Sequence, residues 1–203
     1  MLQISKVVSK AEAMFHDFNQ HFYGGELTTP AITISPDGGH GAYGWTSVHQ
    51  IWRAGEDKYY EINVCAEYLD RPIVEVARTM LHEMAHLYNI IHEIQDVSNN
   101  GYYHNKKFKA TAEAHGLVIE QDPKYGWTLG TLTPEAEAWV LDTFGADSLD
   151  VSRQKEAPTG KANKRGSINR SRKYVCPCCG TSIRATKEVH VICGDCDEDM
   201  TLA

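Results

Sequence analysis

The chain has 203 residues, of which 42% are hydrophobic and 23% are charged, and its formal net charge is −7 at pH 7. This length suits one domain of about 150 residues with a small appendage. The sequence contains no apolar run of about 20 residues, which excludes a membrane-spanning helix, and its N-terminus lacks the apolar stretch of a secretory signal. We therefore expect a cytoplasmic protein, in which disulfides are disfavoured.

The first third of the sequence predicts one helix and then three strands. Residues 4–23 place apolar side chains at a 3,4 spacing, and Gly24 follows them as a helix end. Trp45 and Trp52 are expected to pack in the core or to line the edge of a cleft. The three strands are expected at residues 31–35, 42–47 and 60–64, with glycine-containing turns between them.

A long amphipathic helix is expected next, from about residue 70. Asp70 is a candidate N-cap, and Pro72 falls in the first turn, where its missing N–H costs nothing. Apolar residues then recur at a 3,4 spacing from Ile73 to Ile94. This pattern predicts one apolar stripe on an unbroken helix that packs on a core.

The sequence His82-Glu83-Met84-Ala85-His86 lies in this helix. His82 and His86 fall roughly opposite the centre of the apolar stripe, whereas buried core histidines would fall within it. Two imidazoles four residues apart on one helix face can bind the same zinc ion, and Glu83 between them can take a proton from a zinc-bound water. The pattern predicts a metal-dependent peptidase with Glu83 as its catalytic base.

A catalytic zinc needs a third protein ligand, and two histidines compete for this role. His92 stands six residues after His86, but on an unbroken helix it would point about 100° away from the pair. His104 precedes a second predicted helix, which Asn105 caps and Gly116 ends. From spacing alone, His104 is as compatible with a surface loop as with a metal ligand.

The remaining elements complete the predicted fold. A strand-like stretch after residue 126 precedes a last helix that opens at Thr133-Pro134. The fold class is thus α+β, with helices packed on a small three-stranded antiparallel sheet. We expect this domain to span residues 1–150.

The segment at residues 151–173 differs in composition from the rest of the chain. Residues 153–173 carry eight Lys or Arg and one Glu, a net charge of +7, whereas residues 1–152 have a net charge of −11. We expect a basic flexible linker, which is either simply solvated or binds the phosphates of DNA.

Six cysteines are present, and four of them form a spaced pattern in residues 174–203. Two Cys-x2-Cys turns separated by thirteen residues predict a zinc ribbon held by thiolates. Cys178 creates an alternative within the first turn, but the chosen pair brackets Pro177 and is followed by Gly180. Cys65 is expected as a small buried strand residue. The expected zinc ligands are Cys176, Cys179, Cys193 and Cys196.

The chain resembles the SprT-like zinc metallopeptidases, whose eukaryotic relatives include the Spartan protease. The resemblance begins with ISKVVSKAEAMFHDFNQHFYGGELTTPAITIS, continues through GAYGWTS, YEINVCAEYL and LHEMAH, and ends near YYHNKKF. It implies a zincin-like domain and favours His104 over His92 as the third ligand, although Asn105 stands where Spartan-type members carry glycine. It also implies cleavage of protein, often of protein associated with DNA.

Together these observations predict a zinc endopeptidase with two zinc ions, one catalytic and one structural, that acts on a protein substrate. Tyr43, Tyr102 and Tyr103 are candidates to stabilise the oxyanion. Two alternatives remain open. The target can be a single regulatory protein, or the chain can be a non-catalytic adaptor that binds nucleic acid or a partner protein through its zinc units.

Overall fold

The structure is a computed structural model, and the chain forms two units, Met1–Lys155 and Glu156–Ala203. None of the helices in the described ranges has both the length and the apolar character needed to cross a membrane. The described residues are 3–38, 41–99, 101–147, 149, 151–155 and 171–203.

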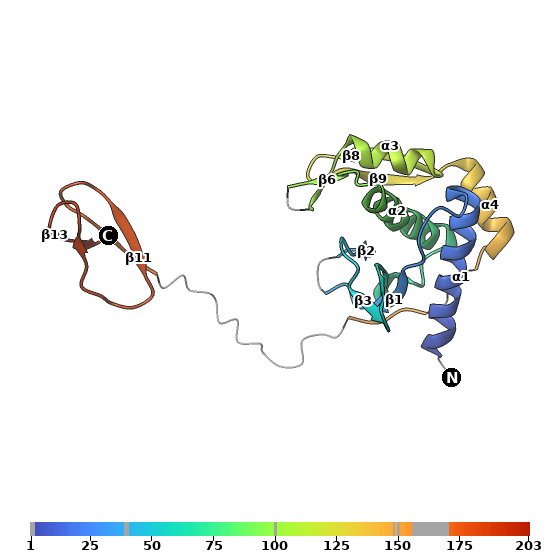
Figure 1. The fold of residues 1–203 in the computed structure, drawn as a ribbon, viewed down its shortest axis with the longest axis horizontal. Coiled ribbons are helices and arrows are strands. Elements are labelled where there is room, and N and C mark those ends of the chain that lie inside the picture. Colours follow the sequence, from blue (N-terminus) through green and yellow to red (C-terminus); the bar gives the residue numbers. More distant parts are fainter. Residues whose placement is uncertain (1–2, 39–40, 100, 148, 150, 156–170) are drawn as a thin grey trace. The chain divides into compact units, whose positions relative to one another are not determined.

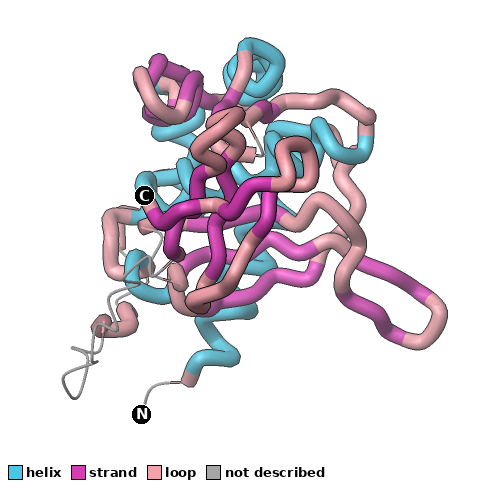
Figure 2. The backbone as a smooth tube through the Cα atoms, turned by 90° about the vertical axis from the view of Figure 1, so that its left-hand side faces the viewer, coloured by secondary structure: helices cyan, strands magenta, loops and turns pink. Residues whose placement is uncertain are grey.

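The first unit places helix α2 between two groups of elements (Figure 1). Strands β1 to β3 lie on one side of α2, and α3 with β8 and β9 lies on the other. Figure 2 marks the helices and strands along the backbone. The helices are α1 (Ile4–Tyr23), α2 (Ile73–Ile91), α3 (Lys106–Ala114) and α4 (Pro134–Phe144), with a 3-10 turn at Ala66–Tyr68. The strands are β1 (Ala31–Ser35), β2 (Gly44–Thr46), β3 (Trp52–Ala54), β4 (Asp57–Tyr59), β5 (Glu61–Cys65), β6 (Val97–Ser98), β7 (Tyr103–His104), β8 (Leu117–Asp122) and β9 (Gly126–Leu132).

The apolar stripes of α1 and α2 form the core of this unit, as their periodicity predicts. Phe18 on α1 and Met80 and Met84 on α2 are fully buried, together with Ile62 from β5. Burial of side chains of this size stabilises the fold by about 1.5–3 kcal/mol each. Cys65 is also fully buried at the end of β5, as expected.

The three-stranded sheet is mixed, which corrects the expected antiparallel arrangement. Its order is β1-β5-β2, with β1 parallel and β2 antiparallel to β5. The chain reverses between β1 and β2 and again before β5, so β5 runs in the same direction as β1. Trp52 is 47% exposed on β3, which rules out the expected place in the core and leaves the cleft-edge alternative open.

A second sheet, of order β6-β7-β9-β8, occupies a region that was expected to be mostly helical. The hairpin of β8 and β9 supplies most of its pairing, with Leu117 opposite Leu132. The two-residue strand β7 pairs parallel with β9 at His104 and Gly126. Strand β7 brings the chain back to α2 after that helix has ended.

Both predicted ends of α2 need correction. Asp70 is not the N-cap, because the helix begins after Pro72, and the Asp70 carboxylate instead accepts a hydrogen bond from Ser152 at 2.7 Å. At the other end the helix stops at Ile91. Glu93 adopts a left-handed conformation (φ 57°), and the Ile94 N–H bonds back to an earlier carbonyl.

The segment predicted as a basic linker begins and ends in structured parts of the chain. At its start Arg153 donates to Glu67 at 3.0 Å and Lys155 donates to Asp37 at 2.8 Å. Its last residues belong to the first strand of the second unit. Residues 156–170 lie outside the described part, so a flexible connection there stays a prediction.

The second unit is a small set of paired strands around a compact cluster. A three-stranded sheet has the order β11-β10-β14, and β12 pairs with β13. Tyr174, Cys176, Cys193 and Met200 are buried together at its centre. The strands are β10 (Arg172–Val175), β11 (Ser182–Ala185), β12 (Ile192–Cys193), β13 (Glu198–Asp199) and β14 (Thr201–Leu202).

Asn105 is the N-cap of α3, as predicted, and its loss should destabilise the first unit. Its side-chain oxygen accepts from the N–H groups of Lys107 at 2.7 Å and Phe108 at 3.3 Å, while its amide donates to the Gln95 carbonyl. We expect Asn105→Ala to lower the free energy of unfolding by about 1–2 kcal/mol. Urea unfolding followed by tryptophan fluorescence measures this, because all four tryptophans lie in the first unit.

Asn105→Asp is the matched control, because it keeps the capping oxygen and removes only the amide donor. It should retain most of the stability that Asn105→Ala loses. Equal destabilisation by both variants would contradict the assignment of the cap as the main contribution.

Candidate metal centre

Helix α2 and strand β7 bring three histidine side chains to one point. His82 and His86 lie one turn apart on α2, and the Nε2 atom of His104 is 3.2 Å from that of His82 and 3.1 Å from that of His86. Tetrahedral nitrogen ligands at 2.0–2.1 Å from one zinc ion would be about 3.4 Å apart. The spacing and the ligand type both fit zinc.

His104 is held by the main chain of the segment that precedes and begins β9. Its backbone N–H donates to the Tyr125 carbonyl at 2.9 Å, and its Nδ1 donates to the same oxygen at 3.2 Å. Gly126 pairs with His104 so closely that a Cβ there would lie 2.2 Å from the His104 carbonyl oxygen. Only glycine permits this approach, and the Nδ1–H bond leaves Nε2 free for a metal.

The Phe108 ring packs against all three imidazole rings. Its ring centroid lies 4.6 Å from those of His82 and His86 and 4.7 Å from that of His104, and the residue is fully buried. The cap of α3 fixes its position in the first turn of that helix. One aromatic ring thus restricts the orientation of all three histidines.

Asp96 orients His86, and sequence reasoning missed it. The His86 Nδ1 donates to the Asp96 carboxylate at 2.7 Å, and Asn89 donates to the same oxygen at 3.0 Å. Thr111 in turn donates to Asn89 at 2.7 Å. A carboxylate behind a ligating histidine is a common partner in metal sites. Nothing in the spacing of Asp96 distinguishes it from other loop acids.

Burial favours the uncharged form of the imidazoles, which is the form that binds metal. Burial and the neighbouring His86 and His104 lower the pKa of His82 well below its usual range. Burial likewise lowers the pKa of His104 to about 4. Burial disfavours the Asp96 carboxylate, but hydrogen bonds from His86 and Asn89 outweigh it and hold the pKa of Asp96 below its ordinary value.

Glu83 lies beside this group, against strand β2. It is 5% exposed, and the Thr46 hydroxyl lies 3.0 Å from its carboxylate and 2.9 Å from its carbonyl oxygen. A Cβ on Gly44 would lie 2.7 Å from a β5 carbonyl and 3.2 Å from the Glu83 side chain, so glycine allows the helix to pack closely on the strand. Burial raises the pKa of Glu83.

His92 lies outside the histidine group. An unbroken helix was expected to point it away from His82 and His86, but α2 ends at Ile91, so other contacts place His92. It follows the last residue of α2 and forms an ion pair with Glu26, with its Nε2 2.9 Å from the carboxylate. Its ring packs on Tyr88 at 4.2 Å. These contacts direct His92 toward the end of α1 and away from His104.

The cysteine group in the second unit is equally compact. The four sulfur atoms lie within 4.8 Å of one another, and those of Cys179 and Cys193 are 3.6 Å apart. This separation is too long for a disulfide and close to the spacing of about 3.8 Å expected for thiolates on one zinc ion. Cys178 is exposed and does not belong to the group. The other members are Cys176 and Cys196.

The three tyrosines considered for the oxyanion have other contacts. Tyr103 accepts a hydrogen bond from Gln121 at 3.3 Å, and the ring of Tyr43 lies 4.2 Å from the Arg71 guanidinium carbon. Tyr102 is 68% exposed. Among the described contacts, none of their hydroxyl groups bonds to Glu83 or to a histidine of the site.

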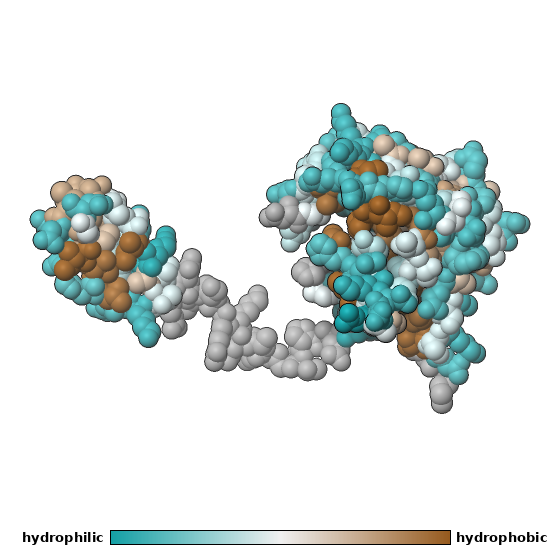
Figure 3. All heavy atoms as spheres, in the orientation of Figure 1, coloured by the Kyte–Doolittle hydropathy of each residue, from teal (hydrophilic) through white to brown (hydrophobic). Residues whose placement is uncertain are grey.

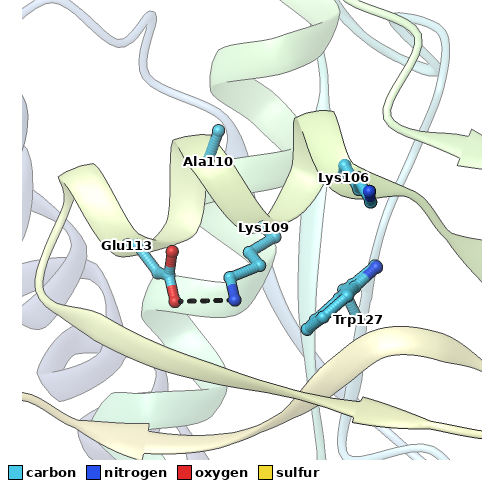
Figure 4. Close-up of a pocket in the computed structure, with 5 residues that line it drawn as sticks. All are labelled: Lys106, Lys109, Ala110, Glu113 and Trp127. Carbon is cyan, nitrogen blue, oxygen red and sulfur yellow. Dashed lines mark ion pairs between the residues drawn. The ribbon is translucent and has the colours of Figure 1, made fainter.

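A shallow pocket of about 380 Å³ lies between α3 and β9, on residues separate from the histidine group (Figure 4). The Lys109 ammonium lies 4.2 Å from the centre of the Trp127 ring and 3.5 Å from the Glu113 carboxylate. Its charge therefore already has two partners within the protein.

We expect Asp96→Ala to weaken zinc binding at the histidine group by about 10–100-fold, because His86 loses the acceptor that fixes its orientation. Competition with a chromophoric chelator measures this affinity in a Cys193→Ser background, where the cysteine site is disabled. Glu93→Gln is the control, since it removes a nearby exposed carboxylate. An unchanged affinity in Asp96→Ala would contradict the role of Asp96.

Comparison with known families confirms the predicted resemblance and the predicted fold class. The profile of the SprT-like family matches residues 11–124, which is more than half of the chain and includes the three histidines and Glu83. This family has a zincin-like domain of metallopeptidase type. No curated protein and no solved structure matches the chain. The chain belongs to the SprT-like family.

Proposed function

We propose that the chain is a zinc-dependent endopeptidase that hydrolyses protein substrates. The supporting observation is the meeting of three histidine Nε2 atoms at 3.1–3.2 Å beside a buried glutamate. A purely structural metal site has no need of a carboxylate in this position, which disfavours the adaptor alternative. The cysteine group would hold a second, structural zinc.

The residues of the site suit metal-assisted hydrolysis of an amide bond. Zinc held by His82, His86 and His104 would polarise the scissile carbonyl and lower the pKa of a water molecule. Glu83 accepts the proton of the attacking water and passes it to the leaving amine. Because burial raises the pKa of Glu83, its carboxylate accepts a proton more readily than an exposed glutamate does.

Strand β2 offers a place for the substrate main chain. Tyr43 and Ser47, on either side of this strand, bond through their backbones to β5, at 2.8 and 2.9 Å. The backbone groups of Gly44 and Thr46 alternate with these and face the other way. In the described sheet β2 is an edge strand, and it is the one that lies beside Glu83, so an extended substrate can add to it there by β-augmentation.

Replacing Glu83 separates metal binding from catalysis. We expect Glu83→Gln to retain about two zinc ions per chain and to lower the cleavage rate of an unfolded protein by at least about 100-fold. Zinc content by atomic absorption and cleavage of a fluorescently labelled unfolded protein measure the two properties. Cleavage by Glu83→Gln at the rate of the parent chain would show that the assigned role is wrong.

Two further variants assign the metals. His82→Ala should lose one zinc ion together with activity, whereas Cys193→Ser should lose the other zinc ion and keep the histidine site. A zinc content of one per chain in the parent protein would contradict the second site.

We also propose that the basic segment at residues 153–173 binds DNA and brings the peptidase to DNA-associated proteins. Its net charge of +7 contrasts with −11 in residues 1–152, and a cluster of Lys and Arg of this kind can bind the phosphates of DNA. Replacing Lys161, Lys164 and Arg165 with serine should weaken DNA binding and reduce its salt dependence. Fluorescence anisotropy with single- and double-stranded DNA at two salt concentrations measures this. Binding that is insensitive to salt would contradict the proposal.

A further inference from the structure

The chain that follows strand β2 exposes three large apolar side chains within five residues. Val48 is 64% exposed, Ile51 is 60% exposed and Trp52 is 47% exposed. Single exposed apolar residues are ordinary, but three in one short stretch of chain make that stretch a candidate interaction surface. We call Val48, Ile51 and Trp52 the apolar extension of β2.

The excursion that carries the apolar extension, residues 48–60, is anchored to the sheet where it begins and ends. The Ser47 N–H donates to the Glu61 carbonyl at 2.9 Å, and the Glu61 N–H donates to the Ser47 hydroxyl at 2.8 Å. The same hydroxyl donates to the His49 carbonyl at 2.8 Å. These bonds close residues 48–60 into an excursion whose first residue directly follows the edge strand.

The hairpin of β3 and β4 within this excursion belongs to no larger sheet. Trp52 pairs with Tyr59, and the two strands of three residues pair only with each other among the described strands. An isolated two-stranded hairpin is marginally stable in water. The three residues of β3 are all exposed, so the hairpin does not bury the apolar extension.

Charge identifies the kind of partner that this surface fits. Residues 41–52, which include β2 and the apolar extension, contain no Asp, Glu, Lys or Arg, although residues 1–152 have a net charge of −11. Arg71 lies 4.2 Å from the Tyr43 ring and Arg53 follows Trp52, but residues 44–52 themselves offer no Lys or Arg to a row of phosphates. An extended polypeptide instead needs main-chain partners and apolar contacts, and this band supplies both. Figure 3 shows hydrophobic residues between the part that carries α3 and the part that carries β2 and β3.

We propose that β2 and its apolar extension form one docking surface for an extended polypeptide segment with bulky apolar side chains. This inference rests on the proposed function and specifies its substrate class. Such segments are buried in folded proteins, so the surface selects chains that are locally unfolded. Alternate side chains of a bound strand face the same side, which predicts a preference for apolar residues at alternate positions.

Peptide binding to the full-length Glu83→Gln chain tests this proposal without cleavage. The probe is a fluorescein-labelled peptide with leucine at alternate positions, and its partner has serine at those positions. We expect the leucine peptide to bind at least about tenfold more tightly than the serine peptide. Adding Val48→Ser, Ile51→Ser and Trp52→Ser should weaken binding of the leucine peptide by a similar factor. Equal affinities for the two peptides would overturn the proposal.

The control is Val118→Ser with Leu129→Ser, which removes two apolar side chains of 42% and 48% exposure from β8 and β9. It should bind the leucine peptide like the parent chain. If the triple variant is misfolded by circular dichroism, Trp52→Ser alone is compared, and hydrogen exchange should show protection of Gly44 and Thr46 by the leucine peptide. Absence of that protection would also overturn the proposal.

Two other results separate this inference from the proposed function and from self-association. Tight binding of the leucine peptide by a parent chain that cleaves no protein would retain the docking surface and refute the endopeptidase. Cleavage of protein without any preference for apolar segments would retain the endopeptidase and refute the docking surface. A parent dimer that the triple variant converts to a monomer in analytical ultracentrifugation would assign the surface to a second copy of the chain.

Discussion

The chemistry of the first unit depends on holding one histidine from a two-residue strand against two histidines of a helix. Helix geometry fixes His82 and His86, whereas His104 is placed by the pairing of β7 with β6 and β9 and by contact with the Phe108 ring. Gly126 allows β7 and β9 to approach closely, and the Tyr125 carbonyl accepts hydrogen bonds from both the backbone N–H and the Nδ1–H of His104. A Cβ at position 126 would clash with the His104 carbonyl oxygen, so a bulkier residue there would displace His104 from the histidine group.

The Nε2 atom of His104 lies within 3.2 Å of those of His82 and His86, and burial disfavours the charged forms of His82 and His104. Burial lowers the pKa values of His82 and His104. The Asp96 carboxylate, whose pKa is lowered by its hydrogen bonds, contacts the Nδ1 of His86, on the opposite side of the ring from Nε2. Burial has the opposite effect on the pKa of Glu83, which it raises. Burial thus shifts the pKa values of His82 and His104 and that of Glu83 in opposite directions, each toward the uncharged form.

The sequence was informative where local periodicity sets geometry and silent where distant segments meet. The positions of His82, Glu83 and His86 on one helix follow from the apolar stripe, as do helices α1 and α3 with the cap at Asn105. Spacing alone left His104 open, because its approach depends on β9, whose partner strands were not anticipated. Asp96 could not be identified from the sequence, because its spacing does not differ from that of other acidic residues in loops. The parallel pairing of β1 with β5 is likewise a property of the whole sheet.

A path of direct contacts links the start of the basic segment to the edge of β2. The Lys155 ammonium donates to the Tyr68 hydroxyl at 3.1 Å, and the ring of Tyr68 packs edge-on against that of Tyr43 at 4.8 Å. Tyr43 immediately precedes Gly44, the first residue of β2. If residues 153–173 bind DNA and β2 binds an unfolded segment, a protein attached to that DNA would be presented near Glu83. Proximity of this kind raises the effective concentration of such proteins at the site, so selection among targets needs no recognition of a particular sequence.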